Sequence, residues 1–557
     1  MAQKTPGAKA DLQVLSIFSD ISPTASRSGF TSWRRVRRFA RESSHARKAI
    51  PVTVRHTLDP MDWSALRAQG HRMLDDLFDY LEHIRERPVW QPIPHEVRAA
   101  FDEPLPQRAT ELAVVHEAFM HKVLPYAVGN AHPGFMGWVH GGGTAVGMLA
   151  EMVAGGLNAN VGGRDQMPVE VERQIVRWMR DLFGFPEGAS GVFVTGTSMA
   201  NLIGLLVART SVLGEGARKE GLGSEGQRLL AYASAGSHAS IAQALDLCGL
   251  GTDRLRLVPL NERLEMDIGA LRQRLAADWA AGYRPFFIAA TAGSVDVGAI
   301  DDLGALADIA RAQGLWLHVD GACGALGMLA PDIAPRLTGI ERADSIAFDF
   351  HKWGQVPYDA GFVLVRDGEL HGRTFAAQAA YLRRDARGLA GGSPWPCDFG
   401  PDLSRGFRAL KAWFTIKTYG AQQLGAMISG TCELAQYLKR RIEATPQLEL
   451  AAPVSLNIVC FRHRGAHSDV LNAEIAAELQ ESGICAPSTT AIHGRLAIRA
   501  AIVNHRTTMD DIDALVAATL KVGAGVGRKH GGRGNISAAV PEPAWRPCPE
   551  PPSRGKP

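Results

Sequence analysis

The chain has 557 residues and a formal net charge of +3, and 46% of its residues are hydrophobic and 21% charged. This composition is close to the globular average and excludes a wholly disordered, collagen-like or fibrous protein. With 60 basic and 57 acidic residues, the overall charge gives no support to binding of nucleic acid or of a membrane surface. The length allows several domains, or one large enzyme subunit with appendages.

The cysteines point to a reducing compartment. Seven are scattered along the chain without a CxxC pair, which argues against a disulfide scaffold or a zinc module. No uncharged apolar run reaches the roughly 18 residues of a membrane span. The N-terminus also lacks the apolar core of a secretory signal. We therefore expect a cytoplasmic protein with no metal site, no membrane contact and no nucleic-acid partner.

Residues 1–56 differ from the rest of the chain. They contain many Arg and Ser residues and few acids, and no helical or strand period lasts long. We expect a disordered leader. The alternatives are a targeting peptide, a nucleic-acid-binding arm, or a natural start at Met61 that would make the leader foreign to the protein.

An N-terminal helical segment is expected over residues 59–140. Asp59 is a good N-cap residue, Pro60 suits the first helical position, and Asp62 would lie in the first turn, where the helix dipole favours a negative charge. Apolar residues then recur near helical spacing as far as Ile84.

Residues 141–440 are assigned to one large domain. Short apolar runs alternate there with helix-like stretches, which predicts an α/β fold with a largely parallel sheet. In such sheets ligands bind outside the carboxyl ends of the strands. The predicted strands are 191–195, 229–233, 255–259, 285–291, 315–320, 345–349 and 361–365. The predicted helices are 200–209, 240–247, 269–280, 302–312 and 404–440.

A smaller α+β domain is expected over residues 441–522. Strands are predicted at 454–461 and 496–501, and helices at 468–482 and 509–520. The tail, residues 523–557, is rich in Gly, Pro and Arg and is expected to be disordered.

A first chemical motif is the strand–turn–helix sequence that ends Thr195-Gly-Thr-Ser198. Gly196 permits a tight turn, and the hydroxyls of Thr197 and Ser198 would lie beside the free amides of a helix N-terminus, which is a phosphate cradle. Taken alone, Ser and Thr at this position are also ordinary helix caps.

Two further strand ends carry charged residues. Asp320 ends an apolar strand, and the small residues Gly321 and Ala322 after it leave room for a flat ring; the alternative is a structural helix cap. Lys352 follows the strand 345–349 directly. Because lysine is almost never buried unless it is paired or used, we predict that partial desolvation lowers the pKa of Lys352 from about 10.4 and makes its amine nucleophilic.

These three segments together fit pyridoxal 5′-phosphate (PLP). This cofactor needs a phosphate cradle, a lysine that bonds to its aldehyde, and an acid that keeps its pyridine nitrogen protonated, so that the ring accepts electrons from a bond broken at the amino acid α-carbon. His238 follows another predicted strand and would stack on the ring; otherwise it is an ordinary loop histidine.

From about Asp59 to Val522 the sequence resembles the group II PLP-dependent amino acid decarboxylases, and in particular aromatic-L-amino-acid decarboxylases. The resemblance is carried by linked motifs in a fixed order. They are Asn130-Ala-His-Pro133, Gly196-Thr-Ser198, Ser237-His238, Thr291-Ala-Gly-Ser294, Gly298-Ala-Ile-Asp301, His318-Val-Asp-Gly-Ala322, His351-Lys-Trp353, Phe407-Arg-Ala-Leu-Lys-Ala-Trp413 and Val503-Asn-His-Arg506.

The resemblance implies the aspartate-aminotransferase-like (type I) PLP fold and a homodimer with its active site at the interface. It implies that Lys352 forms a Schiff base with PLP, that Asp320 pairs with the pyridine nitrogen, and that Ala322 and His238 pack on the two ring faces. Catalysis through a quinonoid would then release CO2 and an amine, with Lys352, His238 and Asp320 as catalytic residues. The remaining implied cofactor contacts are Thr197, Ser198, Ser294 and His351. The resemblance also places His132 in the segment that lines the substrate entrance. Phe135 and Trp138 are predicted to contact the substrate because they belong to the apolar residues that follow Pro133. Arg408 is expected to be structural.

The sequence departs from the family in the mobile loop, which lies between Arg384 and Asp402. Aromatic amino acid decarboxylases carry a Tyr there that is implicated in protonating the quinonoid; this loop has none, and Tyr381 lies upstream of it. Another group could supply the proton, the substrate could differ, or the quinonoid could meet oxygen and yield an aldehyde. We favour plain decarboxylation, because loss of one donor slows protonation without creating an oxidase.

Substrate choice is predicted from the apolar residues that follow Pro133, which favour an aromatic L-amino acid. An acidic or diamino substrate remains the alternative. A rival from another class is a serine hydrolase with Ser198, Asp320 and His351 in chain order, but Ala200 breaks the G-x-S-x-G elbow and the role of Lys352 would be unexplained.

Overall fold

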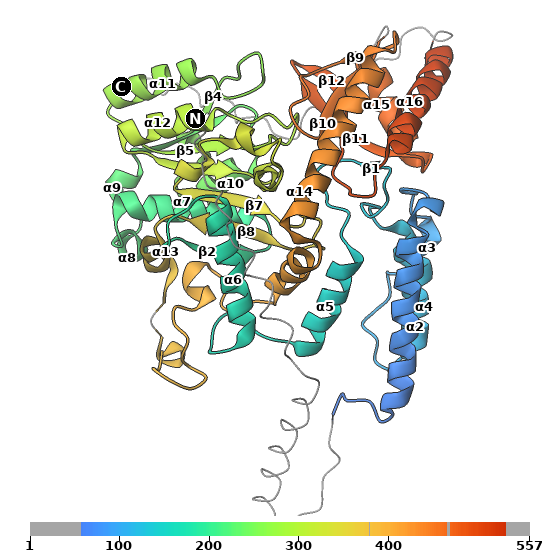
Figure 1. The fold of residues 1–557 in the computed structure, drawn as a ribbon, viewed down its shortest axis with the longest axis horizontal. Coiled ribbons are helices and arrows are strands. Elements are labelled where there is room, and N and C mark those ends of the chain that lie inside the picture. The colour runs from blue at the N-terminus through green and yellow to red at the C-terminus, as the bar shows by residue number, and fades with distance from the viewer. Residues whose placement is uncertain (1–56, 378, 465–467, 531–557) are drawn as a thin grey trace, which may run out of the picture. The chain divides into compact units, whose positions relative to one another are not determined.

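A computed structural model describes residues 57–377, 379–464 and 468–530 (Figure 1). The predicted leader and most of the predicted tail lie outside the described residues. The chain divides into two compact units, residues 1–68 and 69–557. The first unit contributes only the start of helix α2 (Trp63–Glu82) to the described part, and the second unit holds both sheets.

Helix α2 begins later than predicted. Its cap is Asp62, whose Oδ1 accepts hydrogen bonds from the backbone amides of Ser64 at 2.8 Å and Ala65 at 3.2 Å. An N-cap side chain must reach amides two or three residues ahead, and Asp62 does so at the first helical turn. The prediction that Asp59 caps this helix and that Pro60 is its first residue is therefore wrong.

A seven-stranded sheet forms the large domain, in the order β2-β8-β7-β6-β5-β3-β4. Neighbouring strands from β4 to β7 are parallel, and β8 runs antiparallel to both β2 and β7. The predicted largely parallel sheet is confirmed. The strands are β2 (Ser190–Val194), β3 (Leu229–Ser234), β4 (Leu255–Val258), β5 (Arg284–Thr291), β6 (Trp316–Asp320), β7 (Ser345–Asp349) and β8 (Gly361–Val365).

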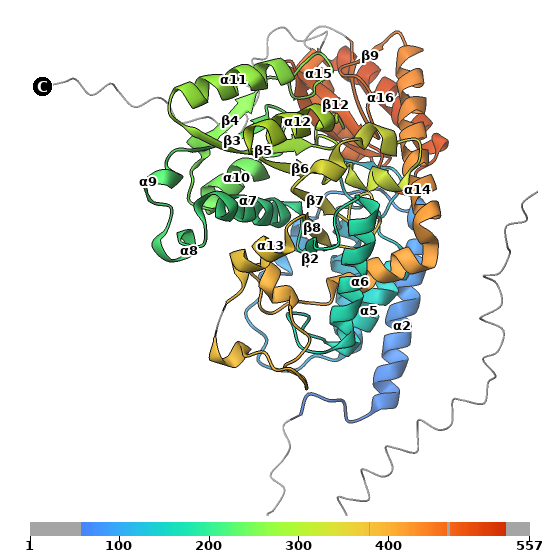
Figure 2. The same ribbon diagram turned by 60° about the vertical axis from the view of Figure 1, so that its left-hand side comes forward.

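The strands of this sheet are apolar on both faces because helices cover both. Alternate strand residues contribute to two separate cores, as in β6, where Leu317 packs on one face and Trp316 on the other. Helices α7 (Thr197–Leu213) and α10 (Ser240–Leu247) cover one face; α6 (Met167–Leu182), α11 (Ile268–Ala280) and α12 (Leu303–Gln313) cover the other (Figure 2). This arrangement leaves the carboxyl ends of the parallel strands free to form a site.

A second sheet of five strands, ordered β1-β11-β12-β10-β9, forms the small domain. Its first strand, β1 (Phe135–Met136), comes from the N-terminal segment and pairs in parallel with β11, a long-range pairing that the sequence did not predict. The other strands are β9 (Leu448–Leu450), β10 (Ile458–His463), β11 (Ala486–Ile492) and β12 (Arg495–Ala501). β9 and β11 were also not predicted.

The remaining helices connect or flank these sheets. α14 (Arg408–Glu443) is broken at Gly420, whose φ is 73°. α16 (Met509–His530) continues through part of the predicted disordered tail, so that prediction is wrong for residues 523–530. Gly523 packs closely on the small domain, because a Cβ there would lie 2.6 Å from the His463 ring. The others are α3 (His95–Ala99), α4 (Leu112–Lys122), α5 (Ala145–Leu157), α8 (Ala217–Glu220), α9 (Gly223–Gly226), α13 (Gly368–Phe375) and α15 (Ser468–Glu481).

Candidate active site

A pocket of about 380 Å3 lies at the carboxyl ends of the large sheet. Its lining residues end or follow the strands β2, β3, β5, β6 and β7. Residues 138–140, which precede the large domain in the sequence, line it as well. The predicted site residues that line it are Thr197, Ser198, His238, Asp320, Ala322, His351, Lys352 and Trp138.

Lys352 is held by a carboxylate that the sequence analysis did not single out. Its Nζ lies 2.8 Å from Oδ2 of Asp349, the last residue of β7, whose side chain is only 2% exposed. Burial lowers the pKa of Lys352, but the negative charges of Asp349 and Asp320 outweigh it and raise the pKa above its ordinary value. The predicted lowering of this pKa is therefore wrong for the protein without its cofactor, because the amine is ion-paired rather than merely desolvated.

The turn between β2 and α7 has the form of an anion site. Oδ1 of Asp349 already accepts a hydrogen bond of 2.8 Å from the Thr197 amide at the start of α7. The Thr197 hydroxyl is buried and, within the described residues, has no hydrogen-bond partner. Gly361 must lack a side chain here, because a Cβ would lie 2.4 Å from the Cα of Gly196. The orphaned hydroxyl and the helix N-terminus fit a phosphate group.

Asp320 is oriented by a chain of hydrogen bonds that starts in the core. Ser345 accepts from Trp316 Nε1 and contacts Nδ1 of His318, while Nε2 of His318 lies 2.9 Å from Oδ1 of Asn201. The amide nitrogen of Asn201 then donates to Oδ2 of Asp320 at 2.9 Å. Burial lowers the pKa of His318 to about 3, so this histidine stays neutral and can donate from Nε2.

Asn201 also connects Asp320 to His238. Its Nδ2 donates to the Ser240 hydroxyl at 3.0 Å, and that hydroxyl lies 2.8 Å from Nδ1 of His238. The backbone amide of Ala322 donates to the other Asp320 oxygen at 3.2 Å. A single hydrogen-bond network thus positions Asp320, His238 and Ala322. This arrangement fits a flat heterocycle that lies between His238 and Ala322 and directs its ring nitrogen at Asp320.

His351 is committed to the backbone and cannot act as a hydrolase base. Its Nδ1 accepts from the Ala360 amide at 2.9 Å, and its Nε2 lies 3.7 Å from Asp349 rather than facing Asp320. Burial lowers the pKa of His351 to about 4. Since Asp320 bonds to Asn201 and Ala322 instead, no Ser–His–Asp relay forms among these residues, and the serine-hydrolase alternative is discarded.

An aromatic row forms the open side of the pocket. The Tyr358 ring packs at a tilt of 34° against the His351 ring, with centroids 4.2 Å apart, and meets His140 edge-on at 5.8 Å. His140 in turn stacks with Trp138 at 6.0 Å. Arg408 anchors this row indirectly, because its Nε donates to the Asp359 carboxylate at 2.7 Å, directly after Tyr358.

Three predicted site residues lie outside the pocket. Phe135 is buried in β1, where it pairs with Ala486. His132 is buried, and its Nδ1 accepts from the Gly134 amide. The Ser294 hydroxyl accepts from the Ala299 amide and so stabilises a turn. These three residues do not line the pocket of Lys352, and their predicted roles stay predictions.

The functional residues that the sequence analysis missed share one signal. Asp349 stands three residues before Lys352, and Asn201 stands four residues after Thr197, one helical turn on. Both are polar residues within apolar surroundings. Asn201 lies on the same face of α7 as Thr197, and Asp349 ends the strand that Lys352 follows. Tyr358 and His140 gave no such signal, because their place depends on long-range packing.

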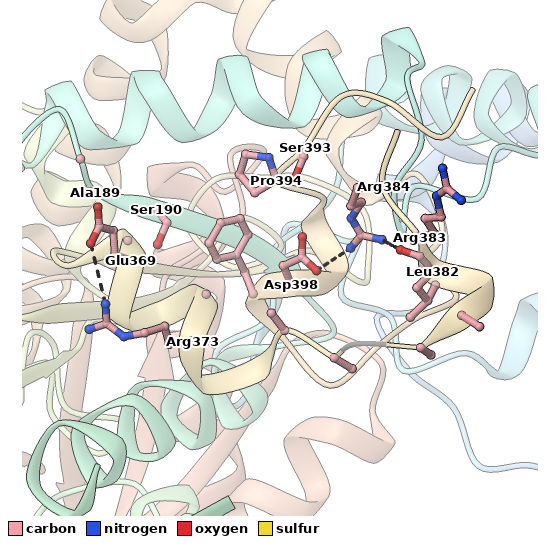
Figure 3. Close-up of a pocket in the computed structure, with 18 residues that line it drawn as sticks. Ala189, Ser190, Glu369, Arg373, Leu382, Arg383, Arg384, Ser393, Pro394 and Asp398 are labelled. Atoms are coloured by element: carbon pink, nitrogen blue, oxygen red, sulfur yellow. Dashed lines mark hydrogen bonds and ion pairs between the residues drawn. The ribbon is translucent and has the colours of Figure 1, made fainter. Parts of the chain in front are cut away.

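A larger cavity, of about 1000 Å3, lies elsewhere, beside α13 and residues 376–399 (Figure 3). None of the predicted site residues lines it. Its arginines are paired with acids, as for Arg384 and Asp398 at 2.7 Å, or Arg373 and Glu369 at 3.8 Å (Figure 3). We therefore place the active site in the pocket of Lys352.

The loop that faces this larger cavity is anchored by Trp395. The indole is 1% exposed, its Nε1 donates to the Gly391 carbonyl at 2.7 Å, and the Arg384 guanidinium lies over its ring. Tyr381 is largely exposed and does not line the Lys352 pocket. Neither residue replaces the tyrosine that this loop lacks.

Comparisons with known proteins agree with this geometry. The family described as "Pyridoxal-dependent decarboxylase conserved domain" matches residues 94–464. The chain belongs to this family.

The chain is 30% identical to aromatic-L-amino-acid decarboxylase of Bacillus atrophaeus over 458 residues, which cover 80% of this chain and 93% of the relative. It is 27% identical to phenylacetaldehyde synthase of Arabidopsis thaliana over 461 residues, covering 80% of this chain and 93% of the relative. The crystal structure of Oryza sativa TDC with PLP and tryptamine has a TM-score of 0.78 at 24% identity and covers 84% of this chain and 100% of that one.

The protein is thus a PLP-dependent amino acid decarboxylase, a carboxy-lyase with the type I PLP fold. Lys352, Asp320 and the Thr197 turn line one pocket, and their side chains fit the three parts that the cofactor needs. Within the described residues, no cluster of His, Cys, Asp or Glu is arranged to bind a metal ion. In the same residues, no helix combines the length and the apolar character that a membrane span requires.

Proposed function

We propose that the enzyme decarboxylates an aromatic L-amino acid to the corresponding amine and CO2. The observation that carries this proposal is the aromatic row of Trp138, His140 and Tyr358 on the open side of the pocket. Trp138 is held by its backbone, which accepts from Arg499 at 2.9 Å and donates to Ser488 at 3.2 Å, while its ring is 55% exposed. A flat side chain would pack on this row.

The charges of the pocket oppose the alternative substrates. Among the residues of this chain that line the pocket, Lys352 is the only lysine or arginine, so the chain itself offers no second cation to recognise an acidic side chain. The two lining carboxylates, Asp320 and Asp349, already accept hydrogen bonds from the protein, which leaves no free acid for the second amine of a diamino acid. An aromatic substrate requires neither.

Each residue of the pocket would have its own role in binding the cofactor and in the reaction. Bound PLP supplies an electron sink for the bond that breaks at the α-carbon. Lys352 would hold the cofactor covalently and Asp320 would keep the ring nitrogen protonated, while Thr197 and Ser198 hold the phosphate. His238 and Ala322 would flank the ring. Orientation by these groups lets the carboxylate leave without further chemistry from the protein.

The carbon that loses CO2 must regain a proton, and the pocket offers a donor that the loop lacks. Burial raises the pKa of the Tyr358 phenol, so it stays protonated at neutral pH. Its ring is partly exposed, and solvent can restore the proton. We therefore propose amine formation over aldehyde formation, with Tyr358 as the donor and Lys352 as the group that releases the product.

A panel of amino acids assayed for CO2 tests the substrate, with amine, aldehyde and peroxide measured in the same samples. We expect CO2 and amine in equal amounts from tryptophan, tyrosine or phenylalanine. Turnover of glutamate or of a diamino acid, with none of the aromatic substrates, would contradict the substrate assignment. Aldehyde and peroxide in place of amine would contradict the proposed outcome at the α-carbon.

We also propose that the enzyme is a homodimer whose interface completes the active site. Helix α5 exposes Met152, Val153 and Leu157, an apolar stripe that a monomer would leave in water, and the Trp138 ring is exposed as well. Light scattering should give twice the mass of the chain. A double variant M152E/L157E should yield folded monomers of low activity; fully active monomers would contradict the proposal.

A cytoplasmic location is proposed on the cysteines. The six that the structure describes are all unpaired, and five of them are buried. Cell fractionation tests this, and recovery of the protein outside the cytoplasm would contradict it.

A further inference from the structure

The cofactor pocket carries a net negative charge before any phosphate enters. Its lining contains two carboxylates, Asp320 and Asp349, and one cation, Lys352. His351 adds no positive charge near neutral pH, because burial lowers its pKa to about 4. Burial and the Lys352 charge likewise lower the pKa of His140. A phosphate that brings up to two further negative charges therefore enters an unfavourable field.

Asp349 lies where that phosphate would be held. It already occupies the Thr197 amide at the start of α7, at 2.8 Å, and an anion bound by the same helix N-terminus would adjoin it. Its side chain is 2% exposed, so the charge cannot turn out into solvent. Its one close cation is Lys352, at 2.8 Å. Lys352 must leave this ion pair to bond with the cofactor's aldehyde.

We propose that Asp349 couples capture of the cofactor's phosphate to the uptake of one proton from solvent. The proton is held among the Asp349 carboxylate, His351 Nε2 and the phosphate, where it offsets the negative charge that the phosphate brings beside Asp349. Cofactor affinity consequently falls as pH rises. Asp349 is thus a positioning residue that sets the charge of the phosphate site, and it pairs with Lys352 while the site is empty of cofactor.

The other titratable groups facing Asp349 do not produce such a pH dependence. Besides Lys352 and His351, they are Tyr358 and Cys323, with Asp320 beyond them. Burial raises the pKa of the Cys323 thiol and of the Tyr358 phenol, and the pKa of Lys352 is raised as well. Between pH 7.2 and 8.5 these groups keep their protons, and the second pKa of a phosphate ester, about 6, lies below this range.

The test is a titration of the cofactor-free enzyme with two ligands, PLP and pyridoxal, followed by quenching of tryptophan fluorescence. Both ligands share the aldehyde, the phenol and the ring nitrogen, so the ratio of their affinities isolates the phosphate. If one proton is taken up, Kd for PLP relative to pyridoxal should rise about tenfold per pH unit, or roughly 20-fold from pH 7.2 to 8.5.

Asp349→Asn should remove this dependence. The amide keeps an oxygen for the Thr197 amide but carries no charge, so PLP should bind at least tenfold tighter than to the wild type at pH 8.5, with a flat profile. Asp344→Asn is the matched control. Asp344 lies directly before β7, whereas Asp349 is its last residue, and the Asp344 carboxylate likewise accepts a hydrogen bond from a backbone amide, that of Leu317, at 2.8 Å. Unlike Asp349, Asp344 does not line the pocket. It should keep the wild-type profile.

Weaker PLP binding by the folded Asp349→Asn variant, or an unchanged profile, would overturn the proposal. If that variant does not fold, calorimetry of the wild type in two buffers of different ionisation enthalpy decides: one proton taken up with PLP and none with pyridoxal supports the proposal, and equal values overturn it. The inference uses the cofactor site but not the proposed substrate. A failed substrate panel would leave this titration unaffected.

Discussion

Asn201 offers a sharp test of how the active site is built. It is 1% exposed and joins three groups: His318 Nε2 at 2.9 Å, Asp320 Oδ2 at 2.9 Å and the Ser240 hydroxyl at 3.0 Å. In Asn201→Ala the Ser240 hydroxyl can still bond to His238, but the His318 donor and one Asp320 oxygen lose their partners. At about 1–3 kcal/mol for each of these two unsatisfied buried groups, the free energy of unfolding should fall by about 2–6 kcal/mol.

The same variant should also change the bound cofactor, because Asp320 loses one of its two donors. We expect PLP affinity to fall about tenfold, equal to about 1.4 kcal/mol, with a shift in the pH titration of the cofactor's absorption band. Urea unfolding of the PLP-saturated enzyme measures the stability, and fluorescence titration measures the affinity.

Asn472→Ala is the matched control for this effect. Asn472 is fully buried and makes three comparable hydrogen bonds, to the His463 amide and to the carbonyls of His463 and Ser468, within the small domain. It should lose similar stability and leave PLP affinity and the spectrum unchanged. Equal effects of both variants on the cofactor, or none from Asn201→Ala, would refute the claim that this network positions Asp320.

Three further outcomes are expected. Tyr358→Phe should slow amine formation by about tenfold or more, because a general acid is lost, and should raise the fraction of aldehyde among the products. Chromatography of the products measures both. An unchanged rate of amine formation and an unchanged ratio of aldehyde to amine would exclude Tyr358 as the donor. Arg405→Ala should lower the free energy of unfolding in urea by about 3–5 kcal/mol, since it leaves the buried carboxylate of Glu172, now 2.6 Å from the guanidinium, without its partner; an unchanged midpoint would contradict this. Burial lowers the pKa of His318 and of His371 to about 3. The stability gained from keeping them neutral is therefore full above pH 6.5 and is lost as pH falls towards 3. In His371→Phe the urea midpoint should fall less between pH 7.5 and 5 than in the wild type, and an equal fall in both proteins would count against this account.

Local patterns in the sequence were sufficient to predict the large sheet. Continuous apolar runs such as β7 are buried on both faces. Polar residues that end or follow these strands reach the ligand edge, as Asp320 and Lys352 do. The helix start was misassigned because both Asp59 and Asp62 satisfy the cap preference, and only the chain geometry decides between them.

Features that depend on distant segments could not be predicted in this way. β1 has two residues and joins a sheet whose other strands lie more than 300 positions later. The pKa of Lys352 moves opposite to the prediction because the sequence indicates burial of the amine but not the carboxylate that Asp349 places beside it. Phe135 and His132 are likewise buried by long-range packing, and neither lines the pocket.

The account depends above all on Lys352 as the residue that holds the cofactor. Reduction of the PLP-loaded enzyme with borohydride fixes the cofactor to its lysine, and mass spectrometry of the peptides locates the label. The predicted result is one pyridoxyl group per chain, on the peptide that contains Lys352, and none in Lys352→Ala. A label on any other lysine, or an unlabelled Lys352 in enzyme that retains its cofactor absorption, would contradict the account.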